Sequence, residues 1–127
     1  MFTLTLDAAP TLEVKGRQHT YRYATDGSSP NPLEAAYATL AGCAGVYARK
    51  ACGTLGIDAT GIRIGLRIVS RPAQPLMPSR IVTSVEFPER FDAAQRAAVI
   101  ASIEQCAVKA LIERGAALEF AVQEAGA

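Results

Sequence analysis

The chain has 127 residues, of which half are hydrophobic and 20% are charged, and its formal net charge is +1. This length suits one domain, so we expect a single domain over residues 1–127, and the small net charge gives no indication of nucleic acid or an anionic membrane surface as a partner. No apolar run is long enough to span a bilayer, and the N-terminus lacks a signal-peptide pattern, which predicts a cytoplasmic protein. In that compartment cysteines are expected to be reduced, catalytic or metal-binding rather than paired in structural disulfides.

The first part of the chain has the pattern of an antiparallel meander. Residues 2–6 alternate in polarity as a half-buried strand does. Residues 11–14 and 18–23 alternate as a second pair of strands, and Gly16 between them supplies a turn. A polar loop over residues 26–29 then leads into the most apolar segment of the chain.

Residues 29–53 predict a long central helix. Pro30 and Pro32 suit its first turn, where the missing N–H has no partner in any case, and Gly53 or Gly56 suits its end. A helix that is apolar on most faces is usually buried. Because short strands could not cover this one within a single chain, we expect a homodimer in which the central helices of two subunits pack together.

The sheet is expected to resume after the central helix. Residues 61–70 alternate apolar side chains with arginine and glycine, and residues 80–87 are rich in β-branched residues, so both predict strands. Residues 71–79 between them contain three prolines, which predicts a connecting loop.

A second helix and a last strand complete the prediction. Residues 93–114 carry apolar side chains at helical spacing, with Asp92 as a suitable N-cap and Gly115 as a stop, and residues 117–122 predict a strand. The expected fold class is α+β, in the order β-β-β-α-β-β-α-β, with mostly antiparallel strands wrapped round two helices.

Two of the three cysteines are candidates for chemistry. Cys43 and Cys52 lie nine residues apart, which places them on opposite faces of a continuous helix, whereas Cys43 and Cys106 could meet across two packed helices. Such a pair supports a cycle in which one thiol becomes a sulfenic acid and the other condenses with it to a disulfide. The alternative is that each cysteine is a small buried hydrophobe, which is our interpretation of Cys52.

Around Cys43 and Cys106 the sequence resembles the OsmC/Ohr family. Asn31-Pro32-Leu33-Glu34, followed by an alanine-rich helix into Leu40-Ala41-Gly42-Cys43, is similar to the family's "Asn-Pro-x-Glu … Ala-Gly-Cys" signature, and Glu104-Gln105-Cys106-Ala107-Val108 resembles its second-cysteine motif. The predicted order of elements is also similar. The resemblance implies an intertwined homodimer with active sites at the subunit interface, and a thiol-dependent peroxidase that acts on organic hydroperoxides.

The resemblance also implies roles for individual residues. Cys43 would be the peroxidatic cysteine and Cys106 the resolving one. Apolar walls would favour an alkyl hydroperoxide over hydrogen peroxide; the candidates for these walls are Leu40, Val46 and Tyr47. An external dithiol would reduce the disulfide, and no metal or organic cofactor is needed.

The sequence departs from the family pattern before the first cysteine. In the peroxidase members an arginine from the N-terminal strands stabilises the thiolate, and a glutamate directly after the Asn-Pro pair holds it. Here Leu33 takes that position and the acid follows at Glu34, an arrangement that resembles a less characterised branch of the family. Arg22, inside a predicted strand, is the preferred cation, and Arg17, near a turn, is the other candidate.

A second departure follows Cys106. Family members commonly have proline there, whereas Ala107 predicts that Cys106 lies within a continuous helix. The two departures keep open an OsmC-like small-molecule binding or redox-sensing protein without efficient peroxidase activity, and also a structural dimer with core cysteines. The only histidine, His19, has no cysteine or carboxylate neighbour in sequence, so it does not support a metal site or a Cys-His dyad.

Overall fold

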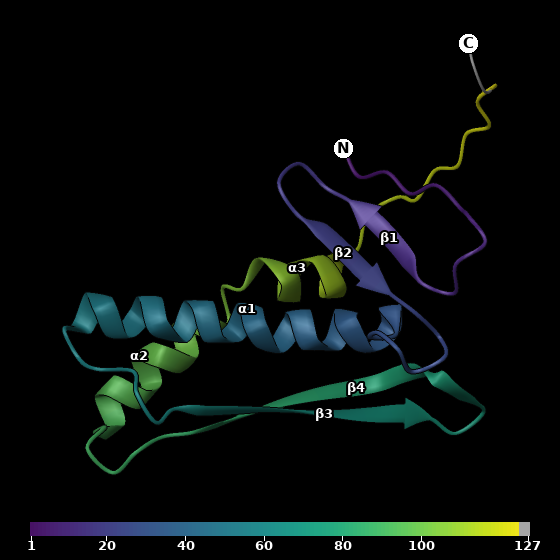
Figure 1. Cartoon of the computed structure of the whole chain (residues 1–127). Coiled ribbons are helices and arrows are strands. Elements are labelled where there is room, and N and C mark those ends of the chain that lie inside the picture. The colour runs from purple at the N-terminus through teal and green to yellow at the C-terminus, as the bar shows by residue number, and fades with distance from the viewer. Residues whose placement is uncertain (125–127) are drawn as a thin grey trace.

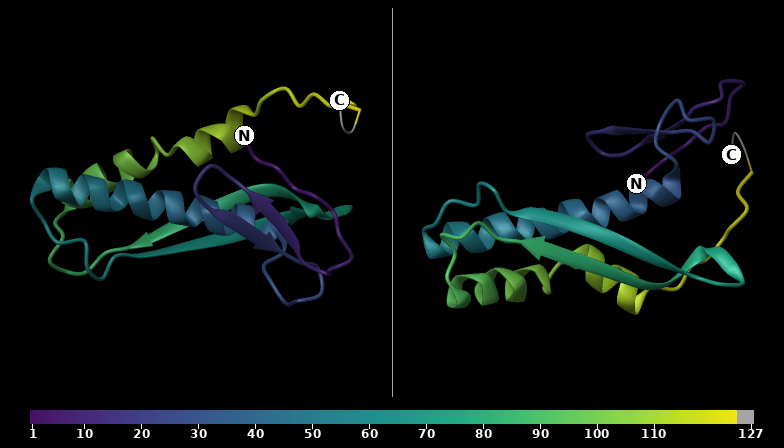
Figure 2. Two further views of the ribbon diagram at one scale, coloured as in Figure 1. Left: turned by 45° about the horizontal axis from the view of Figure 1, so that its top comes forward. Right: turned by 90° about the horizontal axis from the view of Figure 1, so that it is seen from below.

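The computed structural model, which describes residues 1–124, has an α+β fold with antiparallel strands and three helices (Figure 1). The elements in chain order are β1 (Leu12–Lys15), β2 (Thr20–Tyr23), α1 (Pro32–Leu55), β3 (Arg63–Arg71), β4 (Gln74–Glu86), α2 (Ala93–Ile103) and α3 (Ala107–Arg114). The strands form two separate hairpins, β1–β2 and β3–β4. Helix α1 contacts β3, α2 and α3, and α2 and α3 follow one another along its length (Figure 2).

Helix α1 is the predicted central helix. Its N-cap is Asn31, whose side-chain oxygen accepts a hydrogen bond of 2.9 Å from the Leu33 N–H, and Pro32 occupies the first turn. The helix ends at Gly56, whose φ of 71° lies in the left-handed region that glycine adopts without strain. Although α1 has 24 residues, no helix within residues 1–124 is long and apolar enough to cross a membrane.

The hydrophobic core is small and lies between α1, α2 and the loops that join them to the β3–β4 hairpin. Its buried members are Ala44, Ala48, Ala51, Cys52, Phe91, Val99 and Ile103. The α1 contribution is mostly alanine, which lets the other elements approach the helix closely. Cys52 is 1% exposed within this cluster, as expected for a packing residue.

The predicted N-terminal hairpin is present, but the segment before it is not a strand. Leu12 pairs with Tyr23 and Lys15 with Thr20 across β1 and β2. Of the predicted strand over residues 2–6, only Thr3 forms a bridge, through two backbone hydrogen bonds with Lys15.

The predicted loop over residues 71–79 is wrong, because β4 begins at Gln74 and the turn occupies only residues 72–73. Two register shifts, on either side of Ser70, interrupt the ladder where Pro78 faces Ser70. A proline is tolerated at such an irregularity or on an edge, because no ladder hydrogen bond then requires its missing N–H. Proline content therefore misplaced the start of the strand, while residues 80–86 of the predicted strand over residues 80–87 do belong to it.

The predicted second helix is interrupted. Asp92 caps α2 as expected, in a reciprocal pair of hydrogen bonds with Gln95, and Gly115 ends α3. Between them the chain leaves the helix at residues 104–106 through tight backbone turns. Cys106 has extended backbone angles (φ −56°, ψ 128°) and is the N-cap of α3, so the expectation that it lies within a continuous helix is wrong.

The predicted last strand has no pairing partner among residues 1–124. Residues 116–124 form neither helix nor strand, and Leu118, Phe120 and Val122 are 83%, 95% and 98% exposed. Phe2 and Leu6 at the other end are similarly 70% and 75% exposed. Both terminal segments therefore keep the alternation of a strand without the sheet that would cover their apolar side.

Substitutions of Cys52 test its packing role. We expect Cys52→Ala to lower the free energy of unfolding by about 1 kcal/mol, because it removes one buried atom. Cys52→Ser should cost roughly 1–3 kcal/mol more, because it buries a hydroxyl without a partner. Denaturant unfolding at one fixed protein concentration measures both, and equal stability of the serine variant and the unchanged protein would contradict the core assignment.

Candidate thiol site

The break between α2 and α3 brings Cys106 to Cys43. As the N-cap of α3, Cys106 accepts a hydrogen bond from the Lys109 N–H at 3.5 Å, and the residue is 1% exposed. Cys43 projects from α1 and is half-buried. The two thiols lie close enough for each to shift the pKa of the other, as expected for cysteines that meet across packed helices.

The N-terminus of α3 lies beside both sulfurs. The Lys109 N–H donates to the Cys106 sulfur, and the backbone N–H groups of Ala107 and Val108 are near enough to Cys43 to lower its pKa. These amides have no partner inside the helix, and they lie at the positive end of its dipole. The site therefore stabilises negative charge on either sulfur without a metal ion.

The pKa values of the two thiols are shifted in opposite directions. Burial raises the pKa of Cys43, and its hydrogen bond to Cys106 raises it further, against the opposing effect of the α3 amides. Burial alone would also raise the pKa of Cys106. The Cys43 S–H, the N–H groups of Lys109 and Val108 and the Lys109 ammonium outweigh it, so the pKa of Cys106 is lowered. Cys106 is therefore the sulfur that more readily carries the thiolate.

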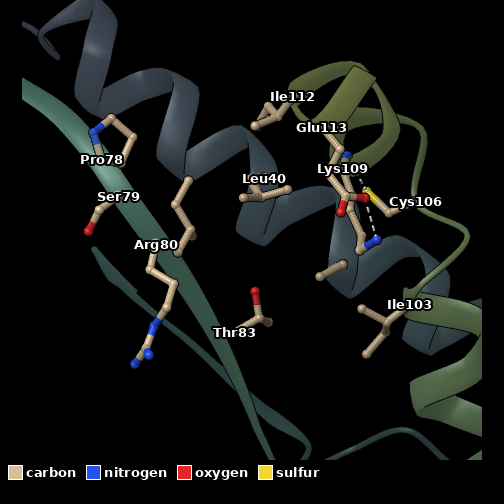
Figure 3. Close-up of a pocket in the computed structure, with 12 residues that line it drawn as sticks. Leu40, Pro78, Ser79, Arg80, Thr83, Ile103, Cys106, Lys109, Ile112 and Glu113 are labelled. Carbon is tan, nitrogen blue, oxygen red and sulfur yellow. Dashed lines mark hydrogen bonds and ion pairs between the residues drawn. The ribbon is translucent and has the colours of Figure 1, made fainter. Parts of the chain in front are cut away.

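A cavity of about 410 Å³ lies beside Cys106, between α1, β4 and α3 (Figure 3). Leu40, Ile103 and Ile112 provide apolar walls, and the Lys109 ammonium pairs with the Glu113 carboxylate at 2.5 Å on the α3 side. The remaining lining residues are Ala44, Pro78, Ser79, Arg80, Ile81, Thr83, Cys106, Lys109 and Glu113. The cavity therefore adjoins Cys106, and Cys43 is not among the residues that line it.

The predicted wall residues separate into two groups. Leu40 lines the cavity as expected. Val46 is 63% exposed, and Tyr47 is half-buried with its backbone carbonyl accepting a hydrogen bond from the Ser102 hydroxyl at 2.9 Å. Neither Val46 nor Tyr47 lines this cavity.

The predicted supporting pair does not reach the thiols within one chain. The Arg22 guanidinium pairs with the Glu13 carboxylate across β1 and β2 at 2.9 Å, and its side chain is 63% exposed. Glu34 is exposed in the first turn of α1, and Arg17 is exposed beside the β1–β2 turn. Among the described residues, no cation contributes to the pKa shift of Cys43.

Sequence reasoning missed Lys109 and the contribution of β4. Lys109 becomes significant only once Cys106 is known to be an N-cap, because it then lies in the first turn beside the sulfur. A proline after Cys106 would have signalled that helix start, and Ala107 removes the signal. Arg80 and Thr83 were placed on a strand, but nothing in their spacing indicated that this strand would face Cys106.

Comparison with known proteins agrees with this architecture. A family model described as OsmC-like protein matches residues 25–121. The chain belongs to the OsmC-like protein family. The match includes Cys43 and Cys106, and it confirms the resemblance found around them.

Several solved structures share the fold at low sequence identity. An OsmC-like protein from Mycoplasma pneumoniae superimposes with a TM-score of 0.70 at 12% identity, covering 89% of this chain and 86% of that one. A hypothetical protein from Aquifex aeolicus VF5 gives 0.68 at 22% identity, covering 91% and 87%.

A third structure, from Psychrobacter arcticus 273-4, is of a protein proposed to be osmotic stress induced and a detoxification response protein. It gives a TM-score of 0.68 at 16% identity, covering 84% of this chain and 83% of that one. A search of curated proteins finds no relative that matches the chain in sequence. At these identities the solved structures establish the fold, and the chemistry has to be argued from the residues.

The Lys109 ammonium provides a test of how the Cys106 thiolate is stabilised. Lys109→Met removes a positive charge that lowers the pKa of Cys106, so less thiolate forms at a given pH. The curve of Cys106 alkylation rate against pH should therefore move to higher pH. Lys50→Met is the matched control, because Lys50 lies over the Tyr47 ring instead. The profile is measured by iodoacetamide labelling of the Cys52→Ala protein followed by peptide mass spectrometry. A shift to lower pH in Lys109→Met would contradict the assignment.

Proposed function

We propose that this protein is a thiol-dependent peroxidase that reduces organic hydroperoxides through Cys43 and Cys106. The observation that supports it most directly is the contact between these two thiols at the N-terminus of α3, beside an apolar cavity. The stress and detoxification description of the Psychrobacter arcticus protein agrees with such a role. The cycle needs no metal or organic cofactor and suits the cytoplasm, where dithiol reductants are present.

The first half of the cycle oxidises Cys43. Its thiolate attacks the terminal oxygen of the hydroperoxide, the O–O bond breaks, and the alkoxide takes up a proton and leaves as an alcohol. Cys43 is then a sulfenic acid. The alkyl group would lie against apolar side chains such as Leu40 and Ile112, which favours an alkyl hydroperoxide over hydrogen peroxide.

The second half forms the disulfide. The Cys106 thiolate attacks the Cys43 sulfur, and the hydroxyl group leaves as water after taking up a proton. The lowered pKa of Cys106 suits this role, because the resolving thiol is then ready as a thiolate. An external dithiol returns both cysteines to thiols.

A homodimer would complete the site. The chain exposes 9989 Å², whereas a folded monomer of 13.4 kDa is expected to expose about 6,500 Å². Part of the additional exposed surface belongs to the strand-like terminal segments, whose exposed residues include Phe2, Phe120 and Val122. Pairing these segments with a second copy would cover their apolar side, as in other obligate dimers.

The dimer also provides a role for Arg22 and Glu34. No cation among residues 1–124 lowers the pKa of Cys43, while Arg22 is exposed on a hairpin next to the N-terminal part of α1. We propose that Arg22 of one subunit stabilises the Cys43 thiolate of the other, with Glu34 holding the guanidinium in place of Glu13.

One observation favours a second candidate function. The pKa of Cys43 is raised within the single chain, which disfavours the attacking thiolate. An OsmC-like protein that binds a small apolar ligand in the cavity, or senses oxidants slowly, would need no efficient thiolate at this position.

Thiol titration after one equivalent of an alkyl hydroperoxide tests the peroxidase. The Cys52→Ala protein should lose two thiols per chain and form a disulfide within the monomer, and Cys43→Ser should abolish the reaction. Cys106→Ser should lose one thiol and accumulate a Cys43 sulfenic acid that dimedone traps. Slow loss of a single thiol in the Cys52→Ala protein would favour the sensor, and no reaction at a modest excess of peroxide would contradict both.

Subunit complementation tests the shared site. Arg22→Met and Cys43→Ser chains should each be inactive alone, and joint refolding should restore about a quarter of the activity, because half of the dimers then hold one complete site. Arg17→Met, refolded with Cys43→Ser in the same way, is the matched control and should be active before mixing. A stable monomer in sedimentation at micromolar concentration, or no recovery on mixing, would contradict the proposed arrangement.

A further inference from the structure

We propose that Ser102 is a positioning residue for the thiol pair, because its hydrogen bond to Tyr47 sets where α3 begins relative to Cys43. The Ser102 hydroxyl lies near the end of α2 and donates to the Tyr47 carbonyl of α1 at 2.9 Å. The inference rests on the proposed function, since it concerns how the cysteines are brought together for the disulfide that the peroxidase cycle forms. Donor and acceptor belong to the same chain, so the contact does not depend on which surfaces a second copy covers.

The hydrogen bond lies about one helical turn from each sulfur along the chain. Tyr47 follows Cys43 by four residues, which places both on the same face of α1. Ser102 precedes Cys106 by four residues on the returning chain, which runs along α1 in the opposite direction (Figure 2). A contact between Tyr47 and Ser102 therefore aligns the chain so that Cys106 comes level with Cys43.

The segment between Ser102 and Cys106 is short and held by backbone hydrogen bonds. The Ser102 carbonyl accepts from the Gln105 N–H at 3.0 Å, and the Ile103 carbonyl accepts from the Cys106 N–H at 3.0 Å. These bonds span three residues each, as in the tight turns of a 3₁₀-helix, and leave little freedom between the two ends of the segment. A shift of Ser102 along α1 would therefore move the Cys106 sulfur with it.

The Ser102 hydroxyl is used differently from the other hydroxyl groups of the helices. A serine or threonine inside a helix can donate to the carbonyl four residues earlier, and Thr39 and Thr54 both do so within α1. Ser102 instead donates to a neighbouring helix. Among residues 1–124, and apart from the contacts of the two sulfurs, this is the only side-chain hydrogen bond that joins α1 to α2 or α3.

Apolar packing alone would not set the alignment as sharply. The contact between α1 and α2 is formed mainly by small apolar side chains, such as Ala48 and Val99. Hydrophobic contact is non-directional, whereas a hydrogen bond has a narrow range of distance and angle. We therefore expect Ser102→Ala to leave the helices packed but able to shift along one another.

The experiment measures the equilibrium of the Cys52→Ala protein with a glutathione redox buffer, so it requires no peroxide. Acid quenching, N-ethylmaleimide labelling and mass spectrometry give the fraction of chains that hold the Cys43–Cys106 disulfide. Ser102→Ala should lower the equilibrium constant for this disulfide about fivefold, because the reduced protein then gains alignments that the disulfide excludes. Ser102→Thr, which keeps a hydroxyl, should remain within about twofold of the protein with Ser102.

Thr54→Val is the matched control, because it removes a hydroxyl that bonds within α1, and it should leave the constant unchanged. Ser102→Val is compared with Ser102→Thr in the same way. These two side chains have the same shape and differ in the hydroxyl, so the test does not depend on the folding of Ser102→Ala. A role in stability alone would lower the denaturation midpoint without changing the disulfide equilibrium. Equal constants for the serine and alanine proteins, or for the threonine and valine variants, would overturn the proposal.

The outcomes also separate this proposal from the proposed function. If Ser102→Ala lowers the constant but alkyl hydroperoxide does not oxidise the protein, the peroxidase fails and the role of Ser102 stands. If alkyl hydroperoxide forms the disulfide but Ser102→Ala leaves the constant unchanged, the role of Ser102 fails and the peroxidase stands. If the redox buffer never joins Cys43 to Cys106, both fail.

Discussion

The candidate site depends on one interaction, the packing of the α3 N-terminus against α1. The chain leaves the helix for three residues before α3, and this break exposes backbone amides just where Cys43 projects from the central helix. A continuous helix would have used those amides internally and left both sulfurs without them. The same break buries Cys106 and places α3 along one wall of the cavity. One structural feature therefore determines the proximity of the two thiols, the charges around them and the apolar pocket.

The two sulfurs have unequal surroundings, and this asymmetry shapes the proposed chemistry. Cys106 is enclosed and has both backbone amides and the Lys109 ammonium nearby, which suits a sulfur that attacks a sulfenic acid. Cys43 is more open and has amides alone. Among residues 1–124 no positive charge lowers the pKa of Cys43, and in the proposed dimer the second copy would supply that charge and cover part of the extensive exposed surface.

The sequence predicted those parts of the fold that local chemistry determines. Pro32 and Gly56 define α1, and Asp92 and Gly115 define the outer ends of the two later helices. Helix periodicity excluded Cys52 as the partner of Cys43 and left Cys106 as a possible one. The failures were of two kinds. The prolines of residues 71–79 predicted a loop, whereas an edge strand with an irregular register tolerates them. The helical spacing of apolar residues continues through Cys106, and Ala107 is compatible with either a continuous helix or the start of a new one, so the break was not predicted. The positions of Arg22 and Glu34 relative to the thiols could not be predicted at all, because they depend on tertiary and quaternary contacts rather than on spacing.

The most direct test of this account is a crystal structure of the protein after treatment with one equivalent of an alkyl hydroperoxide. The account predicts a disulfide between Cys43 and Cys106 of the same chain, with α3 still beginning at Cys106 and Cys52 still a thiol in the core. A bond that involves Cys52, a bond between chains, or two oxidised sulfurs that remain apart would contradict the central claim that the α3 N-terminus brings the reacting thiols together.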